Sequence, residues 1–144
     1  MNIDKLKEFA DVCVLENEKI CISKNLYEIL NFLRLNYSFN MLKSITGVDL
    51  GDETELIYHL FSLENEEDAY ISIKVKFEAE SVADIFDSAK ADENEIYDMF
   101  GIQFIGNEDL KRLYMPENWS GYPLRKDYIQ DDTRLAWNDD SNNA

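Results

Sequence analysis

The strongest constraint on this chain is a stretch of turn-forming and aromatic residues between Glu93 and Tyr128. The stretch contains both prolines of the 144-residue chain and one of its two tryptophans. Proline has no backbone N–H to donate and glycine favours turns, so neither suits the interior of a helix or a central strand. We therefore expect most of the second half of the stretch to run irregularly along a surface.

The first residues of the stretch predict a helix. Asp92 is expected to cap its N-terminus, because Glu95 follows three residues later and both carboxylates would meet free backbone N–H groups. Gly101 is expected to end the helix in the left-handed conformation. The apolar face of this helix would consist of Ile96, Met99 and Phe100.

Shorter elements are expected after this helix. Ile102 and Phe104 predict a short extended piece. Residues 110–115 predict a short second helix, which Pro116 would stop. Residues 119–123 then form a turn-rich aromatic segment.

The charge of this region differs from that of the whole chain. Residues 107–126 contain three acidic and four basic side chains, whereas the chain has a net charge of −16. Arginine beside exposed aromatic side chains is typical of protein interfaces. The composition therefore indicates a surface that docks onto a partner. The alternative is that Trp119 and Tyr122 pin a loop onto the core of this chain.

Three strands are expected in the middle of the chain. Residues 41–50 predict one strand, with Gly47 as a bulge. Residues 56–63 are apolar on both faces, which predicts a central or covered strand. Residues 71–77 alternate between apolar and polar side chains, which predicts a half-buried antiparallel strand ending at Phe77.

Helices and a hairpin are expected around these strands. Residues 3–10 predict a short amphipathic helix, and residues 12–14 and 20–22 predict a hairpin. Ser23 is expected to cap a helix whose buried stripe comprises Leu26, Ile29, Leu30 and Leu33. Ser81, with Asp84 three residues later, predicts another helix that buries Val82, Ile85, Phe86 and Ala89.

An acidic cluster overlaps the last of these helices. Eight acidic residues lie between Glu78 and Asp98. Such a cluster could handle a metal ion or protons. We favour the simpler interpretation, a helical face in contact with water.

The residues that usually hold metals are few. Cys13 and Cys21 lie outside any CxxC motif, and the lone histidine, His59, is distant in sequence. We expect the cysteines to be small buried residues in neighbouring strands, although a disulfide across the hairpin is possible. We expect His59 to be partly buried and hydrogen-bonded. No cofactor or metal ligand set is recognised.

Bulk properties exclude several classes of protein. The length suits one domain, and 30 acidic against 14 basic residues argue against binding to nucleic acid or to anionic lipid. No apolar run approaches the ~20 residues that cross a bilayer, and no signal peptide is recognised. We expect a cytoplasmic chain that reaches a membrane only through partners.

The stretch from Glu93 resembles the signature of a known family. Its parts read ENEIYDMFGIQFIG, LKRL and WSGYPLRKDY. They are similar to the 30 kDa subunit family of NADH:quinone oxidoreductase, which is respiratory complex I. The same domain occurs in energy-converting membrane-bound nickel–iron hydrogenases. The residues that carry the resemblance are Glu93, Glu95, Tyr97, Asp98, Phe100, Gly101, Gly106, Arg112 and Gly121.

The chain departs from the family at a few positions. Asn94 stands where the family usually has arginine, and Asn107-Glu108 stand where it usually has His-Pro. These departures favour the hydrogenase branch or another divergent branch of the family.

The resemblance implies an α+β fold and a non-catalytic role. It predicts a domain over residues 1–106, built mainly of antiparallel sheet packed with helices, followed by an extended partner-docking segment and acidic tail over residues 107–144. The implied partners are the large catalytic subunit, of the 49 kDa or hydrogenase type, and the iron–sulfur subunits, on the cytoplasmic side of the membrane. The expected contacts are Trp119, Tyr122, Pro123, Leu124, Arg125, Lys126 and Tyr128. Leu135 and Trp137 could form a second contact.

Two other functions fit parts of the sequence. A free-standing acidic protein-binding module accounts for the charge but leaves the long signature unexplained. A small hydrolase could use His59 with carboxylates, but the sequence contains no organised catalytic site.

Overall fold

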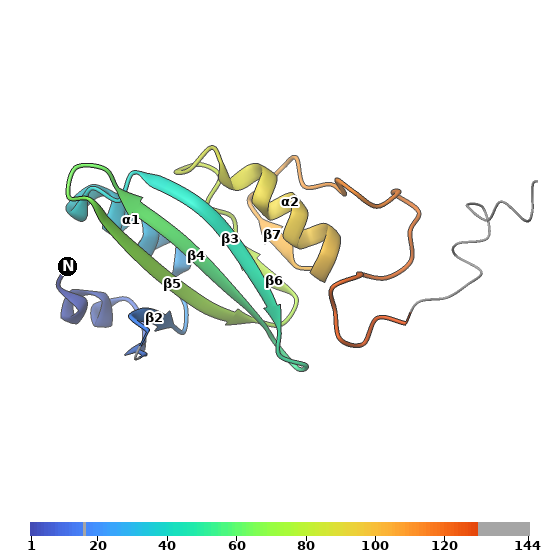
Figure 1. Cartoon of the computed structure of the whole chain (residues 1–144), viewed down its shortest axis with the longest axis horizontal. Coiled ribbons are helices and arrows are strands. Elements are labelled where there is room, and N and C mark those ends of the chain that lie inside the picture. The colour runs from blue at the N-terminus through green and yellow to red at the C-terminus, as the bar shows by residue number, and fades with distance from the viewer. Residues whose placement is uncertain (16, 130–144) are drawn as a thin grey trace, which may run out of the picture.

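The computed structural model describes residues 1–15 and 17–129. The predicted acidic tail, with Leu135 and Trp137, lies outside these residues. Figure 1 shows a curved sheet with two α-helices, followed by an irregular segment. In chain order the elements are η1 (Ile3–Glu8), β1 (Val12–Val14), β2 (Lys19–Ile22), α1 (Leu26–Tyr37), β3 (Met41–Asp49), β4 (Thr54–Ser62), β5 (Glu67–Val75), β6 (Glu78–Glu80), α2 (Ala89–Phe100) and β7 (Gln103–Ile105).

Five of the strands form one mixed sheet in the order β1-β2-β5-β4-β3. Strands β2 and β5 run parallel, and the other neighbouring pairs are antiparallel. Strands β6 and β7 form a separate parallel pair. The predicted α+β fold with a mainly antiparallel sheet is therefore confirmed. Strand β4 lies inside the sheet, as its apolar residues predicted.

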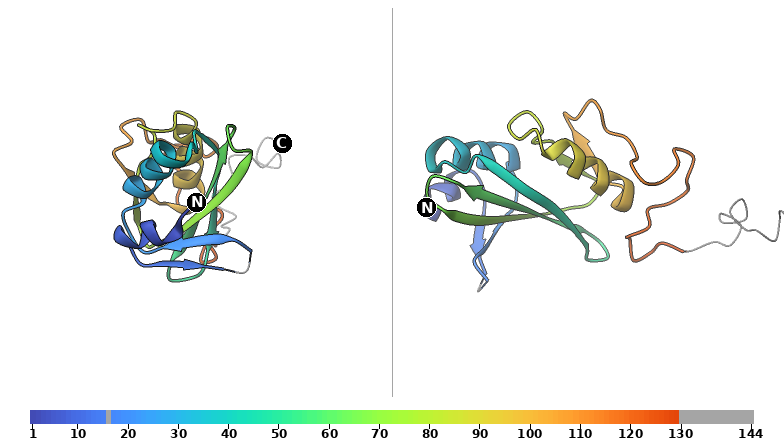
Figure 2. Two further views of the ribbon diagram at one scale, coloured as in Figure 1. Left: turned by 90° about the vertical axis from the view of Figure 1, so that its left-hand side faces the viewer. Right: turned by 45° about the horizontal axis from the view of Figure 1, so that its top comes forward.

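Both α-helices lie on the same face of the five-stranded sheet (Figure 2). On this face Leu56, Tyr58 and Leu60 of β4 are fully buried, whereas the alternate residues Ile57 and His59 are half-buried on the other face. The predicted stripe of α1 is buried in the same core. Among the described residues, no helix covers the second face, which we call the open face.

Polar side chains of α2 cover the free edge of strand β3. The hydroxyl of Ser88, the residue before α2, donates to the carbonyl of Leu42 at 3.0 Å. Burial raises the pKa of Asp92, and the nearby backbone N–H of Ile45 partly offsets that rise. An uncovered edge strand presents unpaired N–H and C=O groups to other chains. The position of α2 therefore protects this end of the sheet.

Gly47 has a different role from the predicted bulge. The irregularity of β3 lies between Leu42 and Ser44, and Gly47 pairs regularly with Leu56. A Cβ atom on Gly47 would lie 2.7 Å from Cε2 of Phe100, so the absent side chain lets α2 pack closely on β3.

The predicted start of the helix in this region is wrong. Helix α2 begins at Ala89, so Asp92 lies within its first turn and does not cap it. The separate helix predicted to begin at Ser81 is also wrong, because residues 83–85 form a turn. The hydroxyl of Ser81 accepts the N–H of Ala83 at 3.2 Å, which favours a local turn over a longer helix. The predicted end is confirmed, because Gly101 caps α2 with a φ of 77°.

The predicted cap of α1 is also wrong. Ser23 accepts the N–H of Asp11 at 3.1 Å and so joins the ends of β1 and β2 that lie away from their connecting turn. Asn25 caps the helix in the left-handed conformation, and its amide donates to the carbonyl of Phe9 at 2.6 Å. Residues 3–8 form a 3-10 helix rather than an α-helix.

Three further side chains are more exposed than the sequence predicted. Strand β5 ends at Val75, so Phe77 lies outside it and is exposed. Cys13 is exposed and Cys21 is half-buried, although the two do lie in neighbouring strands as expected. The reason is that both cysteines belong to the open face, which no described helix covers.

The contact of Gly47 with Phe100 predicts a large effect of one added methyl group. Gly47→Ala should lower the free energy of unfolding by about 1–3 kcal/mol, because a close-packed core resists overpacking. Urea denaturation of the variant and the wild type measures this difference. The cost should shrink in a Phe100→Leu background, and an unchanged cost there would show that the Phe100 ring is not the obstacle.

Candidate functional site

The irregular segment after β7 is the candidate functional site. We call residues 107–129 the docking segment. It contains neither helix nor strand, and it leaves the end of β7 to pass around α2 (Figure 1). Its course is set by hydrogen bonds to side chains that α2 and β3 supply.

Asp98 of α2 is the main anchor of the docking segment. Its side chain is fully buried, and its Oδ2 atom accepts the backbone N–H groups of Leu113, Tyr114 and Met115 at 3.3, 2.7 and 3.0 Å. Its Oδ1 atom lies 3.3 Å from Nη1 of Arg112. One carboxylate thus binds three consecutive amides, and the predicted helix over residues 110–115 is absent because these donors are turned toward Asp98.

Glu93, one turn earlier in α2, anchors the start of the docking segment. Its buried carboxylate accepts the N–H of Val82 and the hydroxyl of Ser81, both at 2.8 Å, and the side-chain amide of Asn107 at 2.9 Å. Burial raises the pKa of Glu93, and these three donors partly offset that rise. The expectation that the acidic cluster is a solvated face is therefore wrong for Glu93 and Asp98.

The end of the docking segment is held by β3 and by the last turn of α2. Asp49 of β3 accepts the backbone N–H of Lys126 at 2.6 Å and that of Gly51 at 2.9 Å. These bonds, the one from Lys126 first, lower the pKa of Asp49. The N–H of Leu124 donates to the carbonyl of Met99 at 3.0 Å, so the segment also satisfies the helix C-terminus.

Aromatic and arginine side chains pack where the segment crosses the end of α2. A Cβ atom on Gly101 would lie 2.6 Å from the ring of Tyr122, so glycine is needed there for contact as well as for the helix cap. The guanidinium of Arg112 lies 4.9 Å from the centre of the same ring, and its Nη2 atom donates to the carbonyl of Gly121 at 3.0 Å. The ring of Tyr97 lies tilted against that of Tyr122, with 6.4 Å between the ring centres.

Several residues of the family signature therefore meet in one place. Tyr97, Asp98, Gly101, Arg112 and Gly121 surround the ring of Tyr122 or hold the backbone beside it. Phe100 is buried against β3, and Glu93 lies one turn away. Glu95 is exposed on α2, and Gly106 turns the chain after β7 with a φ of 102°.

The predicted contact residues divide into two groups. Trp119, Tyr122, Pro123, Arg125 and Tyr128 are half-buried within this chain, and Leu124 and Lys126 are exposed. Arg125 serves the chain itself, because its Nη1 atom lies 3.5 Å from the carbonyl of Phe100.

Besides the predicted contact Leu124, the docking segment exposes three apolar side chains that the sequence did not predict as contacts, Leu113, Tyr114 and Ile129. The exposed fractions are 43% for Leu113, 69% for Tyr114, 56% for Leu124 and 76% for Ile129. A helix over residues 110–115 would have turned Leu113 toward the core, so the wrong helix prediction concealed the exposure of Leu113. The turn-forming residues on either side of residues 110–115 were the signal in the sequence against a helix there.

The remaining candidate residue, His59, is held by contacts between β4 and β5. His59 is half-buried, lies 2.6 Å from Asp68 through its Nε2 atom, and stacks on the ring of Tyr70. Within residues 1–15 and 17–129, no group of three metal-binding side chains occurs. The helices described there also include none with the length and apolarity to cross a bilayer.

The geometry of Asp98 predicts that its charge holds the docking segment in place. Asp98→Asn should lower the free energy of unfolding by more than about 2 kcal/mol, because an amide cannot accept all of these donors and turns an NH₂ group toward them. Hydrogen exchange at the amides of Leu113, Tyr114 and Met115 should accelerate. Asp127→Asn, which removes an exposed carboxylate paired with Arg125, is the control and should change stability by less than about 0.5 kcal/mol.

The lowered pKa of Asp49 predicts that its contribution to the free energy of unfolding depends on pH. A carboxylate with a lowered folded-state pKa contributes stability above its unfolded pKa of about 3.9, and this stability is lost as the pH falls through the folded value. Asp49→Asn should therefore be less stable than the wild type at pH 7, and the difference should narrow below about pH 4. Urea denaturation across this range measures it, and a constant difference would contradict the assignment.

Comparisons with known proteins agree with this architecture. The family described as respiratory-chain NADH dehydrogenase, 30 kDa subunit, matches residues 20–134. The C/D subunit of the NADH-quinone oxidoreductase of Phocaeicola vulgatus is 40% identical over 111 residues, which are 74% of this chain but 21% of that protein. This chain therefore spans about a fifth of the length of that relative.

Two further relatives resemble the chain over most of their length. The J subunit of the NAD(P)H-quinone oxidoreductase of Prochlorococcus marinus strain AS9601 is 39% identical over 130 residues, covering 82% of this chain and 73% of that protein. A chain of the archaeal membrane-bound sulfane sulfur reductase, a respiratory membrane complex, superposes with a TM-score of 0.69 at 26% identity. That alignment covers 94% of this chain and 86% of the other. The chain belongs to the 30 kDa subunit family of respiratory-chain NADH dehydrogenase.

Proposed function

We propose that this chain is a non-catalytic subunit of a membrane-bound multisubunit redox complex, either a complex I-type NADH:quinone oxidoreductase or a related energy-converting hydrogenase. Its role is to support assembly by docking other subunits. Family membership supports the general assignment, since the relatives are named as subunits of quinone oxidoreductases and of a respiratory membrane complex. The departures at Asn94 and at Asn107-Glu108 still favour a divergent branch.

The docking segment carries the proposal. Leu113, Tyr114, Leu124 and Ile129 expose apolar surface, while the backbone beside three of them is fixed by Asp98 and by the carbonyl of Met99. A surface whose backbone is already ordered loses little conformational entropy when a partner binds. This combination favours a preformed protein interface over a loop that merely covers the core.

The chemistry of the segment indicates the kind of partner. It combines exposed aliphatic and aromatic side chains with four basic and four acidic residues, which is the composition of an interface core with a charged rim. The partners we propose are the large catalytic subunit and the iron–sulfur subunits of the same complex, with Trp119, Pro123, Lys126 and Tyr128 among the contacts. The chain itself holds no cofactor in this proposal, and it is peripheral on the cytoplasmic side of the membrane.

A free-standing acidic binding module is a weaker explanation. It accounts for the net charge of −16 but gives no reason for a family match that extends over residues 20–134.

Replacement of one exposed side chain tests the docking role. Leu124→Glu should leave the isolated chain folded, because its side chain is exposed, but it should weaken incorporation into the membrane complex by roughly 30-fold, the equivalent of a hot spot of about 2 kcal/mol. Blue native electrophoresis of detergent-solubilised membranes, with mass spectrometry of the bands, measures incorporation.

A matched control uses an exposed leucine elsewhere. Leu63 lies in the turn between β4 and β5 and is 72% exposed, so Leu63→Glu adds the same charge away from the docking segment. The docking proposal would be contradicted if both variants were incorporated as well as the wild type, or if both lost incorporation to the same extent. Unfolding curves of both variants verify that each remains folded.

A further inference from the structure

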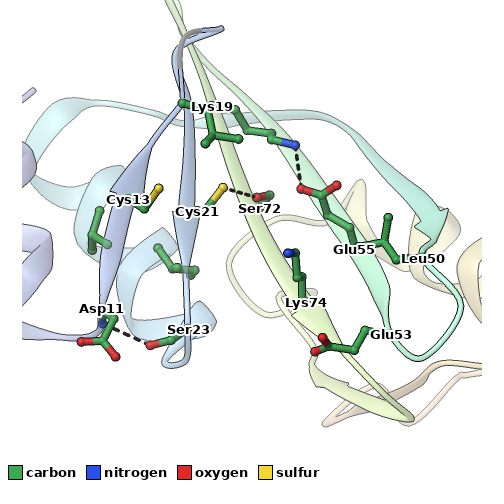
Figure 3. A pocket seen from close by; sticks show the side chains of 13 residues that line it. Asp11, Cys13, Lys19, Cys21, Ser23, Leu50, Glu53, Glu55, Ser72 and Lys74 are labelled. Atoms are coloured by element: carbon green, nitrogen blue, oxygen red, sulfur yellow. Dashed lines mark hydrogen bonds and ion pairs between the residues drawn. The ribbon is translucent and has the colours of Figure 1, made fainter.

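The hairpin at the start of the sheet contains both cysteines of the chain. Strands β1 and β2 are antiparallel, and Cys13 and Cys21 are direct partners in their register. Neither is in a disulfide: Cys13 is an exposed thiol and Cys21 is half-buried. Figure 3 places both sulfur atoms on the open face of the sheet, with Cys13 directed toward β2.

The spacing of the two residues suits a covalent bond. Hydrogen bonds from Leu15 to Lys19 and from Ser23 to Asp11 lie two residues away on either side, so Cys13 and Cys21 occupy a hydrogen-bonded pair of the ladder. Cα atoms of such a pair are about 5.5 Å apart, within the span of a disulfide. The Cβ atoms of facing pairs are about 4.5–5.5 Å apart and a disulfide needs about 3.8 Å, so closure requires a small inward movement.

The surroundings leave the pair accessible. The two cysteines line an open recess of the sheet face, together with Ser72 and Lys74 of β5. The hydroxyl of Ser72 lies 3.2 Å from Sγ of Cys21, and Lys19 is paired with Glu55 at 2.6 Å beside it. Cys21 must therefore rotate away from Ser72 before it can bond to Cys13.

We propose that Cys13 and Cys21 form a reversible disulfide, which makes the hairpin a redox modification site. With a low-molecular-weight disulfide such as oxidised glutathione, the Cys13 thiolate attacks one sulfur of the reagent and releases one glutathione thiol. The Cys21 thiolate then attacks the Cys13 sulfur of the mixed disulfide and releases the second. The two cysteines lose two electrons and two protons in total, and the reagent takes up both.

Two properties follow from the geometry. Cys13 reacts first because it is the more exposed thiol, and Cys21 resolves the mixed disulfide because it faces Cys13 across the ladder. The inward movement strains the closed bond, and strained, exposed disulfides are easily reduced. The bond would join β1 to β2 at the edge of the sheet and would rigidify one wall of the open recess.

Oxidation of the full 144-residue chain tests the proposal. The chain is treated with mixtures of oxidised and reduced glutathione, quenched with acid, and analysed by intact mass spectrometry and by thiol alkylation. The expected product has lost both thiols together, has lost two hydrogen atoms in mass, carries no glutathione and returns to the starting mass with excess dithiothreitol. A stable glutathione adduct on the wild type, or covalent dimers, would overturn the proposal.

Two variants provide controls for the geometry. In the Cys13→Ser variant, Cys21 should remain a free thiol or carry glutathione. The double variant Cys13→Ser/Val14→Cys keeps two thiols but moves one by a single residue, which turns it to the opposite face of the strand. It should accumulate the mixed disulfide at least ~10-fold over the wild type. If the double variant closes as readily as the wild type, the register does not create the site and the proposal fails.

Discussion

The capture of backbone N–H groups by buried carboxylates is the interaction on which the docking segment depends. Asp98 binds three consecutive amides and Glu93 binds the elements on either side of α2. A buried carboxylate without such donors would be costly, and a segment without regular structure would leave its own amides unsatisfied. The buried carboxylates and the amides of the docking segment therefore satisfy each other's hydrogen bonds, and α2 becomes the frame on which residues 107–129 are arranged.

The regular elements could be predicted from the sequence, whereas the contacts that hold the docking segment could not. The stripe of α1, the internal strand β4 and the glycine cap at Gly101 follow from local patterns. The role of Asp98 does not follow from local patterns, because the neighbouring sequence does not determine whether an aspartate carboxylate contacts water or the backbone amides of a distant segment. For the same reason, strand alternation placed Cys13 and Cys21 side by side but did not determine whether a helix covers them.

The departures from the family signature fall on the same frame. Asn107 donates its side-chain amide to Glu93, and Asn94 accepts the backbone N–H of Lys111 at 3.0 Å. Both asparagines thus connect α2 to the docking segment, at positions where the family usually has histidine and arginine. In this chain both connections are made by neutral amide side chains.

The position of the anchors in the sequence has a consequence for biosynthesis. Asp49, Glu93 and Asp98 all precede the docking segment, and they can bind its amides only after β3 and α2 have formed. The segment leaves the ribosome after these anchors, so its apolar side chains can take up their arrangement only once β3 and α2 are in place. A partner that binds this arrangement would therefore select chains in which β3 and α2 have folded.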